Sequence, residues 1–183
     1  MSARKARKER PPLTPDTLGE LALNYVGRFA TTRAKLVTYL RRKVGERGWG
    51  DIHGPDLEAI ASSFAERGYI DDKAYALSKS RALTSRGYGL RRVEQALRSA
   101  GVEEADASGA RDLASEEAVE AALRFAQRRR IGPFAAMRPD PKARERGLAA
   151  MVRAGHSFGI ARALIDLEPG TEIDREQLRG MFG

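Results

Sequence analysis

Arginine and lysine side chains carry the clearest chemical potential in this sequence, because they gather in blocks along the chain. The sequence has 33 Lys and Arg against 25 Asp and Glu, which gives a formal net charge of +8 and a pI near 10.1. An arginine guanidinium offers N–H donors in a planar fork that fits phosphate and carboxylate groups. The chemistry that these residues predict is anion binding, and a basic chain of this size indicates an anionic partner.

The candidate binding residues lie in basic segments on either side of an acidic one. Residues 28–43 contain six bases and no acid, whereas residues 103–120 contain one base and seven acids. A solvated helix face is the ordinary fate of such side chains, but the sign bias and the choice of arginine favour a binding surface. The candidates for contact with a partner or with nucleic acid are Arg33, Lys35, Arg41, Arg42, Lys43, Arg86, Tyr88, Arg91, Arg92, Arg98, Arg128, Arg129 and Arg130.

Catalytic and metal-binding patterns are not found in the sequence. Cysteine is absent, and the two histidines, His53 and His156, lie about a hundred residues apart. Gly87-Tyr88-Gly89 lacks the third glycine and the preceding strand of a dinucleotide fingerprint, and no Walker-type phosphate loop is present. The pair Asp71-Asp72 is better explained as a helix cap than as a cation site. We therefore expect no catalytic residues, no metal and no cofactor, and we expect that the protein is not an enzyme.

The elements that must position the arginines are expected to be helices. Apolar residues recur at i, i+3, i+4 and i+7, as in the stripe of Val93, Ala96, Leu97 and Ala100. Helix starts are indicated by a capping residue or a proline in the first turn, at Thr14-Pro15, Pro55-Asp56, Ser115, Asp140-Pro141 and Ser157. In the helix from about residue 72 to 85, Tyr75, Ala76, Ala82 and Leu83 could share one face, which Lys79 interrupts. Because no segment has a convincing strand pattern, the predicted fold class is all-α.

The apolar pairs Leu36/Leu40, Val93/Leu97 and Ile160/Leu164 indicate three degenerate three-helix units along the chain. We expect these units at residues 14–68, 69–114 and 115–168, packed as an elongated array. The flanking segments are expected to be a flexible basic tail, residues 1–13, and a C-terminal tail, residues 169–183. Within the first unit, residues 45–54 form a glycine-rich loop whose Trp49 is expected to fold over the nearby helices.

The composition also predicts a cytoplasmic protein. No run of ~18 apolar residues could span a membrane. The basic start of the chain is not followed by the apolar core of a signal peptide. The absence of cysteine fits a reducing compartment.

A longer ordered signature runs through the central helices of the chain. It reads Gly68-Tyr69-Ile70-Asp71-Asp72, then Arg86-Gly87-Tyr88-Gly89, then Arg91-Arg92-Val93 and Leu97. This signature resembles the RecX family of recombinase regulators, and the resemblance extends more weakly over about residues 15–167. Lys79 departs from the aromatic or aliphatic residue that the family often has, and Leu90 departs from its frequent proline. The resemblance implies tandem three-helix repeats in a curved shape.

The resemblance also implies a function. RecX-like proteins bind the RecA recombinase filament on DNA and restrain its strand exchange and ATP hydrolysis, which places them in homologous recombination, DNA repair and the SOS response. The expected partners are the RecA filament and DNA, bound directly or through the filament, and the chain is expected to be a monomer.

The alternative is a stand-alone DNA-binding regulator of the helix-turn-helix type, in which one helix of a pair enters the major groove. The candidate helices expose Arg more than Asn or Gln, which favours backbone contact over base reading. Base stacking by single strands is not expected, because aromatic residues are 7% of the chain and are predicted to face mostly inward.

Overall fold

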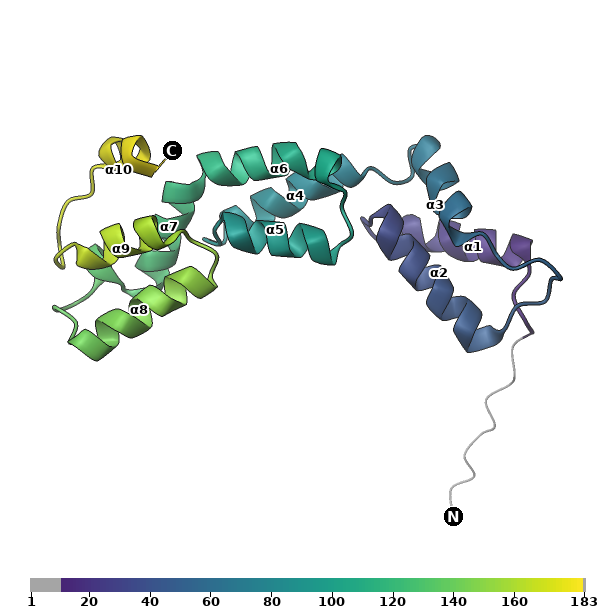
Figure 1. Ribbon diagram of the computed structural model, residues 1–183, viewed down its shortest axis with the longest axis horizontal. Helices are drawn as coiled ribbons and strands as arrows, with labels where there is room; N and C mark the ends of the chain where they lie inside the picture. Colours follow the sequence, from purple (N-terminus) through teal and green to yellow (C-terminus); the bar gives the residue numbers. More distant parts are fainter. Residues whose placement is uncertain (1–10, 183) are drawn as a thin grey trace, which may run out of the picture. The chain divides into compact units, whose positions relative to one another are not determined.

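The computed structural model describes residues 11–182, and every regular element in that range is a helix (Figure 1). One isolated β-bridge joins Leu13 and Trp49. The predicted all-α class is confirmed. The chain forms two compact units, an N-terminal unit over Met1–Asp71 and a C-terminal unit over Asp72–Gly183.

The N-terminal unit consists of α1 (Pro15–Val26), α2 (Arg33–Arg47) and α3 (Leu57–Glu66). Each helix is capped at its N-terminus by a side chain that accepts a hydrogen bond from a backbone N–H of the first turn. The capping residues are Thr14 for α1, Thr32 for α2 and Asp56 for α3. The core beneath them is aliphatic and is led by the fully buried Leu13, Leu18, Leu36 and Leu40. Trp49 packs against this core as predicted, and its indole N–H donates to the His53 carbonyl at 2.6 Å.

The predicted tail, residues 1–13, extends too far into the chain. Leu13 is fully buried, its N–H donates to the Gly48 carbonyl at 3.0 Å, and its own carbonyl accepts the N–H of Gly50 at 2.9 Å. A large aliphatic side chain next to a capping threonine can fix the chain to the core, even directly after two prolines. Residues 1–10 lie outside the described part of the chain.

The C-terminal unit contains α4 (Asp72–Thr84), α5 (Leu90–Ser99), α6 (Glu104–Glu116), α7 (Ala118–Arg129), the short 3₁₀ helix η1 (Gly132–Phe134), α8 (Pro141–Arg153), α9 (Phe158–Asp166) and α10 (Arg175–Phe182). In Figure 1, α4, α5 and α6 lie side by side, and they enclose one apolar cluster around Val93 and Leu97. A second cluster, around Phe125, Met151 and Leu164, joins α7, α8 and α9. Tyr88 packs against both clusters, so the corner before α5 is where they meet.

Residues 11–182 thus contain three apolar clusters, one for each predicted set of three helices. The second and third clusters share one compact unit. The division into three repeats, with the boundaries given above, stays a prediction.

Two sequence-based expectations about the helices are wrong. Ser115 does not cap a helix, because α6 continues through it to Glu116 and α7 begins at Ala118. In α4, Ala82 is exposed, whereas Ser80 and Thr84 are buried beside Ala76 and Leu83. The Ser80 hydroxyl donates to the Ala110 carbonyl at 2.7 Å. This hydrogen bond allows a polar side chain to be buried where α4 packs against α6.

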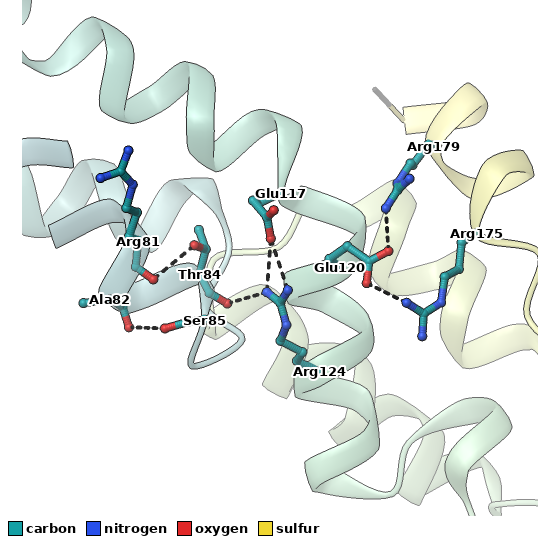
Figure 2. A network of polar contacts seen from close by, with 9 residues as sticks. All are labelled: Arg81, Ala82, Thr84, Ser85, Glu117, Glu120, Arg124, Arg175 and Arg179. Carbon is teal, nitrogen blue, oxygen red and sulfur yellow. Dashed lines mark hydrogen bonds and ion pairs between the residues drawn. The ribbon is translucent and has the colours of Figure 1, made fainter. Parts of the chain in front are cut away.

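Within the C-terminal unit, polar contacts join α7 to the end of α4 and to α10 (Figure 2). Arg124 of α7 donates to the Thr84 carbonyl at the end of α4 and pairs with Glu117, each at 3.2 Å. Glu120 of α7 accepts from Arg175 at 3.1 Å and from Arg179 at 2.8 Å, so α10 is fastened to α7. The predicted C-terminal tail therefore contains a helix that is docked on the unit.

Candidate anion-binding groove

A groove of about 740 Å³ opens in the C-terminal unit, and five arginines contribute to its lining. We call it the arginine groove. Among the described residues, no acidic side chain lines it. Its lining residues are Arg86, Tyr88, Arg92, Phe125, Arg128, Arg129, Ala150, Arg153 and Ala154.

The groove is built where two chain corners touch backbone to backbone. One corner joins α4 to α5, and the other joins α8 to α9. The N–H of Gly89 donates to the Ala154 carbonyl at 3.0 Å, and the N–H of Arg91 donates to the Gly155 carbonyl at 3.2 Å. A Cβ on Gly89 would lie 2.4 Å from the Gly155 oxygen, so only glycine permits this approach. The contact holds Arg86 and Arg92 beside Arg153.

The buried side chain of His156 joins the same two corners by a hydrogen bond. Its side chain is 2% exposed, and its Nε2 lies 3.1 Å from the Gly87 carbonyl oxygen, to which it donates. The imidazole also meets the Phe125 ring edge-on, with centroids 5.5 Å apart. Burial lowers the pKa of His156 to about 4, and the hydrogen bond to Gly87 opposes this shift only partly. The histidine is therefore a neutral structural residue at neutral pH.

Acidification is expected to destabilise the C-terminal unit through His156. Its pKa is lower in the folded state than the ordinary 6.5, so the unfolded chain binds the extra proton first. Stability is then lost as the pH falls from about 6.5 towards 4, and the loss between pH 7 and pH 4.5 should be about 2 kcal/mol. Urea melts of the wild type at several pH values measure this slope. His156→Gln should show a shallower slope, and an unchanged slope would contradict the assignment.

Aromatic rings hold four of the groove's guanidinium groups. Those of Arg86 and Arg92 lie 5.7 and 6.0 Å from the centre of the Tyr88 ring. Those of Arg128 and Arg129 lie 5.5 and 5.9 Å from the centre of the Phe125 ring. These distances are in the range of cation–π attraction, which stabilises an arginine without consuming its hydrogen-bond donors.

Further hydrogen bonds orient two of these arginines and leave donors for a ligand. Arg128 donates to the Arg86 carbonyl at 2.5 Å, and Arg92 donates to the Gln95 side chain at 2.7 Å. Since a guanidinium carries five N–H donors, each of these side chains keeps several for an anion. The arrangement can therefore bind phosphate or carboxylate groups at more than one point.

Five of the predicted site residues meet in the groove. They are Arg86, Tyr88, Arg92, Arg128 and Arg129. Arg91, Arg98 and Arg130 are exposed but do not line it. Arg153 lines the groove and was missed, because a cation in the last turn of a helix already has a structural explanation. Its position just before the Ala154-Gly155 corner was the available signal.

The remaining candidates belong to α2 in the N-terminal unit, and several are engaged in ion pairs. Arg41 lies 3.9 Å from Glu58, whereas Arg42 and Lys43 lie 3.5 and 2.6 Å from Glu46. Exposed pairs of this kind contribute little to stability and leave the cations accessible. A binding role for Arg33, Lys35, Arg41, Arg42 and Lys43 stays a prediction.

Within residues 11–182, no three His, Asp or Glu side chains come together as a metal site would require. In the same range, no helix combines the length and the hydropathy that crossing a bilayer would need.

The fold and the groove together give an all-helical protein with a basic groove lined by arginine and aromatic side chains. No protein-family model matches the chain. A regulatory protein RecX of Myxococcus xanthus (strain DK1622) is 37% identical over 186 residues, an alignment that covers 89% of this chain and 94% of that protein. The regulatory protein RecX of Agrobacterium fabrum (strain C58 / ATCC 33970) is 30% identical over 133 residues, covering 70% and 71% of the two chains. The chain belongs to the RecX family, as its central signature predicts.

Solved structures show the same fold. The crystal structure of RecX from Lactobacillus salivarius has a TM-score of 0.59 at 22% identity, covering 82% of this chain and 93% of that one. A second RecX crystal structure has a TM-score of 0.58 at 22% identity, over 82% and 71% of the chains.

Proposed function

We propose that this protein is a non-enzymatic modulator of the RecA recombinase that acts in the cytoplasm as a monomer. It binds the RecA–DNA filament and restrains strand exchange and ATP hydrolysis. Membership of the RecX family supports a regulatory role, since both relatives described above are called regulatory proteins. The arginine groove is the observation that carries the proposal beyond the family.

The groove suits a filament because a filament presents repeated anions. Its five arginines, with no acid among the lining residues, can neutralise either DNA phosphates or acidic side chains of the recombinase. Contacts from the groove and from other basic segments would add through avidity, so the proposal does not require any one of them to be strong alone. Binding should therefore weaken as salt is raised.

A RecA ATPase assay on single-stranded DNA tests this function. The wild-type protein should lower the rate of ATP hydrolysis. Arg92→Ala/Arg153→Ala removes two groove arginines and should raise the concentration needed for half inhibition by about tenfold or more, because charge-assisted hydrogen bonds are lost. The matched control is Arg81→Ala/Arg146→Ala, which removes the same charge from exposed positions of α4 and α8 outside the groove.

The outcomes distinguish an effect of net charge from an effect of the groove arginines. Equal weakening by both double variants would mean that only net charge matters. No binding to the filament and no effect of the wild type on ATPase would end the proposal. Thermal melting of each variant checks that the C-terminal unit remains folded.

The helix-turn-helix alternative finds less support. A recognition helix contacts bases through its N-terminal residues. The start of α5 is packed against the corner between α8 and α9, since the N–H groups of Gly89, just before α5, and of Arg91 donate to the Ala154 and Gly155 carbonyls. A specific footprint on duplex DNA without RecA would favour the alternative.

A further inference from the structure

Three aromatic rings form a continuous row on the N-terminal unit. Tyr39 of α2 stacks on Tyr25 of α1 with centroids 4.2 Å apart and an interplanar angle of 14°. Tyr25 in turn meets Phe29, just after α1, at 5.4 Å and 48°. We call these three residues the aromatic ladder. Its members come from two segments, so it is a product of the fold rather than of local sequence.

Cations flank the Tyr39 end of the ladder. The Arg42 guanidinium lies 5.7 Å and the Lys43 ammonium 5.8 Å from the centre of the Tyr39 ring. Glu46 pairs with both, but residues 28–43 contain six bases and no acid. Phe29 and Tyr39 therefore lie within this basic segment, and Tyr25 lies shortly before it.

The other end of the ladder is open. Phe29 is 57% exposed, whereas Tyr25 and Tyr39 are half-buried. The expectation that the aromatic residues face mostly inward is thus wrong at this position. A phenylalanine that stabilises a core is buried, because its contribution to stability comes from the apolar area that is removed from water. Phe29 instead offers an accessible ring at the end of a stacked pair.

We propose that the aromatic ladder binds single-stranded nucleic acid by stacking a base on Phe29, while Arg42 and Lys43, at the Tyr39 end of the ladder, offer positive charge to phosphates further along the strand. Every base has an aromatic face, and proteins that hold single strands without sequence preference combine stacked rings with basic side chains. Duplex DNA would not use this site, because its bases are already stacked. The ladder is separate from the arginine groove, which belongs to the other compact unit and binds charge alone.

The test separates the contribution of the bases to binding from that of the phosphates, and it uses the full-length protein. Fluorescence anisotropy compares a labelled 15-nucleotide oligothymidine with an abasic strand of the same length and charge. The wild type should bind the oligothymidine more tightly by roughly 5- to 100-fold, the range expected for stacking of one base. Phe29→Ala should remove most of this difference, and Phe29→Tyr, which keeps the ring, should preserve it.

Two controls make the result specific. Leu23→Ala removes another exposed apolar side chain of the same unit, 50% exposed, and should leave the difference unchanged. Arg92→Ala/Arg153→Ala should weaken both strands equally and leave the difference intact, so failure of the groove and failure of the ladder are distinguishable. Equal wild-type affinity for the two strands, or an equal loss on both in Phe29→Ala, would overturn the proposal and leave Phe29 as a contact for another protein.

Discussion

Gly155→Ala is expected to destabilise the C-terminal unit by about 3–5 kcal/mol and to weaken filament binding at the same time. The φ of Gly155 is +96°, a conformation that an L-residue rarely adopts. Its added Cβ would lie 2.5 Å from the Arg92 backbone nitrogen and 2.9 Å from the Gly89 oxygen. The corner must move, and the two backbone hydrogen bonds that join the corners are then weakened.

Gly170 provides the matched control for this substitution. It also has a positive φ, +81°, but a Cβ there would meet nothing within 4 Å. Gly170→Ala should therefore cost only the backbone strain, about 1 kcal/mol. Urea unfolding of both variants makes the comparison. If the two substitutions cost the same, close approach of the corners does not stabilise the unit.

Leu97→Ala is expected to cost ~2–5 kcal/mol. Leu97 is 2% exposed and lies in the apolar cluster that α4, α5 and α6 enclose. Truncation would remove packed methyl groups and leave a cavity that the surrounding helices can fill only in part. Denaturant melts measure the loss, and a value under about 1 kcal/mol, the range of surface changes, would contradict the buried stripe.

Arg98→Ala is the control on the same helix. Its side chain is exposed one position further along α5, so the change should stay within about 0.5 kcal/mol of wild type. The adjacent pair thus tests the predicted phase of the helix as well as the size of the core contribution.

Local signals in the sequence predicted the helices well. Thr14, Asp140 and Ser157 cap α1, α8 and α9 as expected, because a cap depends on a side chain and the backbone only a few residues away. The stripe on α5 was equally readable, since helical periodicity is a property of one segment. The prediction that Ser115 caps a helix was wrong, because a serine inside an alanine-rich helix is the same residue type as a serine at an N-cap.

The site could be predicted only in part. The sequence identified most of the groove's arginines as candidates, but it could not show which would meet. Their convergence depends on contact between Gly89 and Gly155, which no local pattern encodes. Phe29 departs from the expectation that aromatic residues face mostly inward, because α1 ends at Val26 and the chain turns before Phe29.

The walls of the arginine groove are made at different times during synthesis. Arg86 and Arg92 leave the ribosome well before Arg128 and Arg153, and both late residues are needed to complete the lining. A nascent or prematurely terminated product that stops after α6 would carry the central signature of its family without most of the residues that line the groove. Translation must therefore proceed past α8 before the lining is complete.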